Sequence, residues 1–322
     1  MIETKSLSKY YGDLAAVTDL NLTIQDGDIF GFIGPNGAGK TTTMRVLVTL
    51  LEPTRGKAFI NGLDVTKKGK QVRRLVGYMP DFMGVYDDLK VFEYLEFFAA
   101  AFGIDRRKRK SIVDGVLELT DLQSKRSAAV DSLSRGMQQR LGLARVLIHD
   151  PKVLILDEPA SGLDPRARIE IRELLRELKR MGKTIMISSH ILSELEEICD
   201  HIGIIEHGQL VFSGTLEEIH PRLGIQSKVR VKVADNQDKA VELLSALPQI
   251  GEVQVTAGHI VVTFRDLPLA GDNDGTCARR QPTDTGIIAR TLVNGDIDVV
   301  SLQPEQLKLD EAFLKLTKGI VH

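Results

Sequence analysis

The chain has 322 residues, 43% of them hydrophobic and 27% charged, with a formal net charge of −2. This length suits about two domains with a sizeable buried core, and the absence of a basic excess argues against a general nucleic-acid binder. No apolar stretch approaches the roughly 18 residues that a membrane-spanning helix needs, and two cysteines exclude a disulfide framework. We therefore expect a cytosolic α/β or α+β protein.

The first two thirds of the chain alternate between predicted strands and predicted helices. Apolar runs rich in β-branched residues predict buried strands, and longer amphipathic stretches predict helices. In chain order, these are a strand at 29–33, helices at 40–50, 91–102, 108–120 and 136–148, a strand at 153–156, a helix at 165–180 and a strand at 184–187. The alternation favours a mostly parallel sheet covered on both faces. The mainly helical reading from about 85 to 150 predicts an inserted helical subdomain.

The pattern changes near residue 225. Residues 228–234 alternate between polar and apolar side chains, as a half-buried strand does. The order β-α-β-β-α-β-α predicts a small ferredoxin-like domain with one added helix. Its elements are expected at 228–234, 239–247, 251–256, 258–265, 285–293 and 297–302 and from Leu309 onward, with a loop at 267–287.

The strongest chemical signal is the run of residues 34–41, which matches the phosphate-binding pattern G-x-x-x-x-G-K-[ST]. Glycines let successive backbone N–H groups point at phosphate oxygens, and the following helix directs its positive end at the same anion. Lys40 supplies a positive charge for the β- and γ-phosphates, and the Thr41 hydroxyl can ligate Mg²⁺. An ordinary glycine-rich turn is the alternative, but a predicted strand precedes the run and a helix follows it.

A second signal is the strand at 153–156, which ends in Asp157 and Glu158. Two carboxylates at a strand end suit a metal site and a general base: Asp157 would hold Mg²⁺ and Glu158 would polarise an attacking water. A solvated acidic turn is the alternative, and the nearby phosphate-binding pattern makes it the weaker interpretation.

A third signal is the run of residues 133–140, just before a helix. Ser134 suits the N-terminal cap of that helix. Alternatively, Ser134 and the backbone of Gly136 bind a γ-phosphate at the start of the helix. The residues alone do not decide between these interpretations.

In combination, these motifs resemble the ATP-binding subunit of an ATP-binding-cassette (ABC) transporter, over about residues 2–220. Residues 226–322 resemble, more loosely, the accessory domain of exporter-type subunits. The resemblance implies an α/β P-loop cassette with a mixed sheet at 1–225 and a C-terminal α+β ferredoxin-like domain at 226–322. It rests on residues 34–41, 133–140, Asp157-Glu158, Ser161-Gly162-Leu163-Asp164 and Ser188-Ser189-His190.

The resemblance also implies roles for individual residues. Tyr11 would stack on adenine, although a tyrosine at a sheet edge has the same appearance, and His190 would touch the γ-phosphate and brace the lytic water. In the family two cassettes pack head to tail, so Ser134, Arg135 and Gly136 would reach the ATP bound by a partner subunit. The expected ATP-binding residues of this chain are Tyr11, Gly34, Pro35, Asn36, Gly37, Ala38, Gly39, Lys40, Thr41 and Thr42.

The sequence departs from the family pattern at three positions: Asp81, Arg135 and Met137, which stands where the signature usually has glutamine. Asp81 stands where a glutamine usually follows Gly-Tyr-x-Pro. An aspartate can ligate Mg²⁺ but cannot donate a hydrogen bond to water, and Asp81 can equally be a turn residue that faces solvent. Arg135 replaces the first glycine of the signature and either lies near the partner's nucleotide or faces solvent. The expected Mg²⁺ ligands are therefore Thr41, Asp157 and Asp81.

The expected function is an ATP-hydrolysing motor subunit that acts, as a homodimer or with a similar subunit, on a separate membrane permease. The exporter-like C-terminal domain favours export, and the subunit would lie on the inner face of the cell membrane without binding nucleic acid. Two alternatives are a soluble cassette ATPase of translation or DNA maintenance and a nucleotide sensor with little turnover.

Overall fold

The computed structural model describes residues 1–81, 84, 88–189, 195–215, 218, 228–256, 258–265 and 285–305. It contains two compact units, the first including Met1–Leu216 and the second Glu217–Lys315. The domain boundary expected at 225/226, most of the loop expected at 267–287 and the helix expected from Leu309 lie outside the described residues. Within those residues, no helix is long and apolar enough to cross a membrane.

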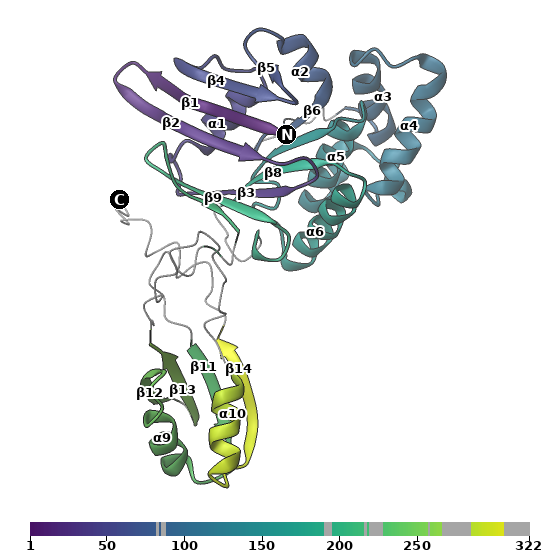
Figure 1. Ribbon diagram of the computed structural model, residues 1–322. Coiled ribbons are helices and arrows are strands. Elements are labelled where there is room, and N and C mark those ends of the chain that lie inside the picture. The colour runs from purple at the N-terminus through teal and green to yellow at the C-terminus, as the bar shows by residue number, and fades with distance from the viewer. Residues whose placement is uncertain are drawn as a thin grey trace. The chain divides into compact units, whose positions relative to one another are not determined.

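The main sheet of the first unit has six strands. All neighbouring pairs are parallel except β9 and β10, so the predicted parallel arrangement is confirmed. The order is β10 (Gln209–Gly214), β9 (His201–Glu206), β3 (Ile29–Ile33), β8 (Thr184–Ser189), β7 (Val153–Asp157) and β6 (Val76–Met79) (Figure 1). Strands β3, β7 and β8 are buried along their whole length, as expected for parallel strands covered on both faces.

A second, antiparallel sheet was not predicted from the sequence. It contains β2 (Leu14–Ile24), β1 (Ile2–Tyr11), β4 (Arg55–Ile60) and β5 (Leu63–Asp64), in that order. Register shifts interrupt the β1–β2 and β1–β4 pairs, and in β1 and β2 only residues 19–24 alternate strictly between buried and exposed. These interruptions obscure the period-two pattern from which a strand is predicted.

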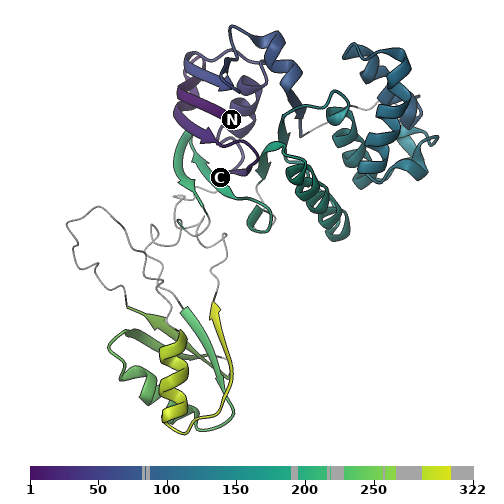
Figure 2. The ribbon, with the colours of Figure 1, turned by 45° about the vertical axis from the view of Figure 1, so that its right-hand side comes forward.

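The predicted helical region is present. Helix α3 (Val91–Ala101), helix α4 (Arg106–Leu119) and two short 3₁₀ turns, Gln123–Lys125 and Val130–Ser132, precede helix α5 (Arg135–Leu147) (Figure 2). Asp105 caps α4 by accepting a hydrogen bond of 2.8 Å from the backbone N–H of Arg107.

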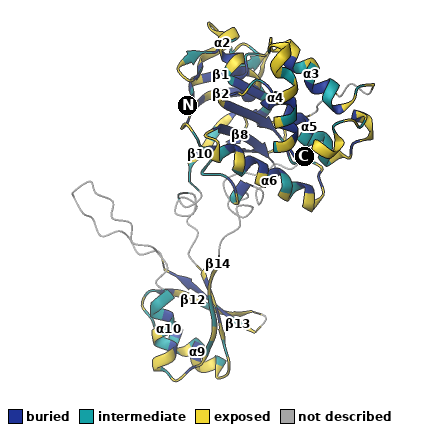
Figure 3. Cartoon of the chain, turned by 90° about the vertical axis from the view of Figure 1, so that its right-hand side faces the viewer, coloured by how far each residue is buried: buried dark blue, intermediate teal, exposed yellow. Residues whose placement is uncertain are grey.

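The first unit also contains helices α1 (Lys40–Leu47), α2 (Gly69–Leu75) and α6 (Pro165–Arg180). Helix α1 is shorter than the expected 40–50, because Thr49 adopts a left-handed backbone with φ of 66° and ends the helical path. The largest buried side chains include Phe30 and Phe32 of β3 and Met44 of α1, and the burial map shows the buried residues concentrated along the sheets (Figure 3).

The second unit matches the predicted ferredoxin-like order. Its strand order is β12-β13-β11-β14, and all neighbouring strands are antiparallel. Both helices contribute buried residues to one shared hydrophobic core. The elements are β11 (Lys228–Val233), α9 (Gln237–Ser245), β12 (Ile250–Thr256), β13 (His259–Phe264), α10 (Thr285–Asn294) and β14 (Val299–Glu305).

We predict that Leu244→Ala destabilises the second unit by about 2–5 kcal/mol, because it leaves a cavity in a small core where Leu244 is fully buried. Amide hydrogen exchange of peptides from residues 228–305, read by mass spectrometry, measures this loss. Val293→Ala, at a side chain that is 62% exposed, is the control and should change exchange little. Unchanged protection in Leu244→Ala would contradict this account of the core.

Candidate functional site

The carboxyl ends of the parallel strands bring distant sequence motifs to one edge of the main sheet. Ile33 of β3 lies opposite Ser189 of β8, and Ser188 lies opposite Asp157 of β7. On the other side of β7, Met79 of β6 lies opposite Leu156. In open α/β sheets, ligands bind at this edge, so the motifs that follow these strands form one candidate site.

The loop of residues 34–39 joins β3 to α1, and two of its glycines are required by close packing. A Cβ on Gly34 would collide with the backbone carbonyl of Ile205. Gly39 has a φ of 106° and lies against the carbonyl of Ala16, so a larger residue is excluded there as well. Helix α1 starts at Lys40 with no side-chain cap, which leaves its first N–H groups for an anion.

Lys40 is held inside this loop. Its Nζ donates hydrogen bonds to the carbonyls of Gly34 at 2.6 Å and Pro35 at 3.2 Å, and lies 3.9 Å from Glu158 Oε1. Burial lowers the pKa of Lys40, and the charges of Glu158 and Asp157 partly offset that effect. A phosphate beside Nζ would stabilise the charged amine further.

Asp157 is almost completely buried, with 1% of its surface exposed. Its two carboxylate oxygens accept hydrogen bonds from the hydroxyls of Thr41, at 2.7 Å, and Ser188, at 2.6 Å. A carboxylate and a hydroxyl that already touch provide the hard oxygen donors that Mg²⁺ prefers. Across the described part of the chain, no group of three or more His, Cys, Asp or Glu side chains is placed to hold a metal. The donors present therefore fit Mg²⁺ that arrives with phosphate oxygens and water.

Glu158 follows Asp157 in a left-handed backbone conformation, with φ of 53°. This conformation is uncommon for residues other than glycine, and such strain is concentrated at functional sites. The backbone N–H of Glu158 donates a 2.9 Å hydrogen bond to Ser188 Oγ. The carboxylate is 12% exposed, which leaves it accessible beside Lys40.

Ser188 is a site residue to which the sequence assigned no individual role. Its hydroxyl donates to Asp157 and accepts from the N–H of Glu158, so one side chain orients both acidic residues. The serine was visible as part of a strand-end motif, but its role depends on the register between β7 and β8. The residue pattern of one strand does not show which residues of the neighbouring strand lie opposite it.

Residues 134–136 lie at the start of α5. Ser134 caps the helix by accepting from the N–H of Met137 at 3.4 Å, and its exposure also leaves it open to a ligand, so both interpretations remain compatible with its position. The Cα of Gly136 faces the Ala167 methyl group of α6. Among the described residues, no hydrogen bond or ion pair joins this run to the phosphate loop.

The other predicted site residues take different positions. Tyr11 ends β1 with 45% of its surface exposed, and Lys9 Nζ lies 5.4 Å from its ring centroid. Asp81 is exposed just beyond β6, at the same sheet edge as Asp157, and has no hydrogen bond or ion pair with another described residue. His190 lies outside the described residues.

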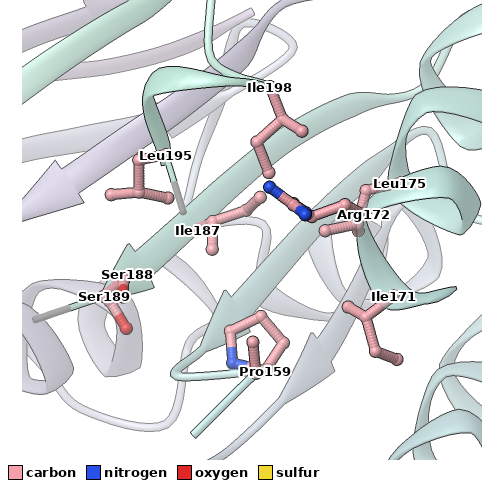
Figure 4. A pocket seen from close by; sticks show the side chains of 10 residues that line it. Pro159, Ile171, Arg172, Leu175, Ile187, Ser188, Ser189, Leu195 and Ile198 are labelled. Atoms are coloured by element: carbon pink, nitrogen blue, oxygen red, sulfur yellow. The ribbon is translucent and has the colours of Figure 1, made fainter. Parts of the chain in front are cut away.

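A small cavity lies beside this edge but does not fit a nucleotide. It has a volume of about 20 Å³ and is lined by Pro159 and Ala160 and by residues of α6, the end of β8 and segment 195–198 (Figure 4). Pockets for ligands of nucleotide size are usually some 300–1,000 Å³. In Figure 4 the side chain of Arg172 lies near Ile187 and Ile198, and its guanidinium pairs with Glu197. The cavity is therefore part of the packing that supports the end of β8.

Comparison with known proteins gives consistent matches. The family profile described as ABC transporter matches residues 17–161. The bacitracin transport ATP-binding protein BcrA of Bacillus licheniformis is 38% identical over 323 residues, which cover 99% of this chain and 98% of that protein. The Nod factor export ATP-binding protein I of Cupriavidus metallidurans is 40% identical over 219 residues, covering 68% of this chain and 72% of that protein.

A solved structure also matches more than two thirds of the chain. It is titled "Structure of ATP binding subunit of ABC transporter" and is 32% identical, with a TM-score of 0.64. The match covers 70% of this chain and 94% of that chain. The match to BcrA, in contrast, extends through the C-terminal residues of this chain.

We predict that Ser188→Ala weakens binding of a magnesium–nucleoside triphosphate by about tenfold, because Asp157 and the Glu158 N–H both lose a buried partner. Titration with a fluorescent nucleotide at fixed Mg²⁺ measures the affinity. Ser132→Ala, which removes an exposed hydroxyl that donates to the Ala129 carbonyl, is the control. Equal affinity in Ser188→Ala and the wild type would show that Ser188 does not organise the site.

Proposed function

The chain belongs to the ABC transporter family of ATP-binding subunits, and on this premise we propose that it is the ATP-hydrolysing motor of an exporter whose permease is a separate polypeptide. One observation carries the proposal: Lys40, Thr41, Asp157, Glu158 and Ser188 form one contact network at the edge of the main sheet. These are the phosphate-binding, metal-binding and general-base groups that phosphoryl transfer to water requires.

Binding of ATP is assigned to the phosphate loop. The backbone N–H groups of residues 34–39 and the start of α1, including Thr42, would surround the phosphates. Lys40 would exchange its bonds to the carbonyls of Gly34 and Pro35 for bonds to the β- and γ-phosphate oxygens. Tyr11, which is almost half exposed at the end of β1, would stack on the adenine ring.

Thr41 and Asp157 are the residues that would hold Mg²⁺, since their oxygens are already in contact. Bound there, the ion would supply positive charge that offsets the negative charge of the triphosphate. Asp81 lies at the same edge and is an additional candidate ligand, with a shorter reach than the glutamine usual in the family.

Glu158 is assigned as the general base for hydrolysis. Water attacks the γ-phosphorus, the bond between that phosphorus and the bridging oxygen of ADP breaks, and Glu158 accepts a proton from the water. Lys40 stabilises negative charge on the transferred group. His190 follows β8 directly in the sequence, and we assign it to the γ-phosphate by its place in the family motif.

A second subunit would complete the site. Ser134 and Arg135 are exposed at the start of α5, and among the described residues nothing bonds them to the phosphate loop of their own chain. In a head-to-tail pair they would bind the γ-phosphate of the partner's ATP. A homodimer satisfies this arrangement, and so does a pair with a similar ATPase subunit.

Export is favoured by the relatives. One is a bacitracin transport ATP-binding protein and another is a Nod factor export ATP-binding protein. The match to the bacitracin protein extends over the C-terminal unit, so the similarity is not confined to the ATP-binding fold. The proposed location is the cytoplasmic face of the membrane, through contact with the permease.

We predict that Glu158→Gln lowers ATP turnover at least a hundredfold, because an amide cannot accept the proton of the attacking water. The variant should retain ATP and accumulate as a nucleotide-bound dimer. Phosphate release and light scattering after size exclusion measure the two effects. Glu177→Gln, on the exposed part of α6, is the matched control. A slow wild-type turnover that Glu158→Gln leaves unchanged would favour the nucleotide-sensor alternative.

We further predict that tagged Glu158→Gln protein, purified with Mg-ATP from detergent-solubilised native membranes, retains a polytopic membrane protein in roughly one-to-one ratio. Mass spectrometry of the bound material identifies it. Lys40→Ala protein, which should not hold ATP because the phosphates lose Lys40, is the control. Retention of soluble proteins or ribosomes alone would contradict the motor proposal.

A further inference from the structure

Arg135 is a cation in an unusual electrostatic position. It is the first residue of α5, where the helix dipole places partial positive charge, and the first turn of α5 contains no acidic residue. Among the described residues, no carboxylate pairs with the Arg135 guanidinium and no hydrogen bond to it is formed. Neither the helix nor an ion pair therefore explains where this side chain lies.

The guanidinium of Arg135 lies against Gly162, in the loop between β7 and α6. A Cβ on Gly162 would come well inside 3.0 Å of the Cζ and of both terminal nitrogens of Arg135. Similar closeness to all three atoms means that the flat face of the guanidinium covers the glycine. Gly162 also has a φ of 66°, so this loop position favours glycine for two independent reasons.

The loop that carries Gly162 is tightly connected to Glu158. The N–H of Ser161 donates to the carbonyl of Glu158 at 3.1 Å. At the other end, Asp164 caps α6 by accepting from the N–H of Ala167 at 3.0 Å, and Arg168 Nε donates to the carbonyl of Leu163 at 2.9 Å. A shift of Gly162 therefore reaches the backbone of Glu158 through a short, hydrogen-bonded segment.

We propose that Arg135 is a positioning residue that, through its stack on Gly162, sets the position of the loop after Glu158 when the partner's nucleotide reaches the start of α5. This inference rests on the dimeric ATPase proposed above. Arg135 is next to Ser134 at the start of α5, and its planar group lies against Gly162. Two properties of the Arg135 side chain act together. Its positive charge would face the partner's phosphate, and its planar guanidinium would hold the Gly162 loop in position.

Substitution by lysine separates these two properties. Arg135→Lys keeps the positive charge but removes the planar group that stacks on Gly162. We expect Arg135→Lys to keep KM for ATP within about twofold of the wild type and to lower kcat by about tenfold. Arg135→Ala should lower kcat by a similar factor and also raise KM. If Arg135→Lys has the kcat of the wild type, the positive charge of residue 135 is sufficient for its role, and the proposal is wrong.

A double-mutant cycle tests the contact itself. Gly162→Ala displaces the guanidinium and also strains a left-handed backbone, but the strain is the same whether residue 135 is arginine or alanine. We expect Gly162→Ala to lower kcat about tenfold more in the wild type than in Arg135→Ala. Independent, multiplicative losses would overturn the proposal. Gly182→Ala, at a φ of 79° with open space around it, is the control for backbone strain.

The two proposals can fail separately. If wild-type protein hydrolyses no ATP, with or without its permease, then the proposed function fails, and the positioning role of Arg135 in hydrolysis fails with it. If the wild type is active but Arg135 and Gly162 are uncoupled, only the positioning role fails. Thermal unfolding of each variant verifies that a loss of kcat is not a loss of folded protein.

Discussion

A buried negative charge is the constraint on which the site depends. Asp157 is 1% exposed, and burial of an ionised carboxylate is costly unless hydrogen bonds and nearby cations compensate. Thr41 and Ser188 each donate a hydroxyl to it, and the charge of Lys40 interacts with it. These partners come from the ends of two other strands, β3 and β8, so the parallel sheet must form before the charge can be compensated.

The same arrangement explains why the nucleotide and the metal belong together. In the described structure, Lys40 faces the two carboxylates Asp157 and Glu158. A triphosphate adds further negative charge, which one lysine and one helix N-terminus do not balance. A divalent cation on Thr41 and Asp157 would neutralise both the phosphates and the buried carboxylate. Glu158, whose carboxylate lies 3.9 Å from Lys40 Nζ, would then be left to act on water.

Local patterns in the sequence were sufficient to predict the elements around the site. The phosphate loop and the Asp157-Glu158 strand end are contiguous runs, so their fold and chemistry can be predicted without knowing the rest of the chain. The strands and helices predicted between residues 228 and 302 were also found, with small shifts in their bounds. The bifunctional role of Ser188 and the contact between Arg135 and Gly162 were not found, because each joins segments that are distant in sequence. The antiparallel sheet of β1 was missed because bulges interrupt its alternation.

The departures from the family pattern follow a physical division within the site. Lys40 and Glu158 are assigned to direct contacts with the triphosphate and the attacking water. Their chemistry must suit these reacting groups, so it permits little change. Arg135 lies where the site would meet a second subunit in the proposed assembly, and Asp81 is only an additional candidate ligand. At both positions the geometry can be adjusted without altering the reacting groups. The stack of Arg135 on Gly162 is such an adjustment: it adds a planar contact four residues after the general base. Under the proposal above, a difference of this kind changes how fast hydrolysis proceeds when the partner's nucleotide reaches α5, while the reacting groups stay the same.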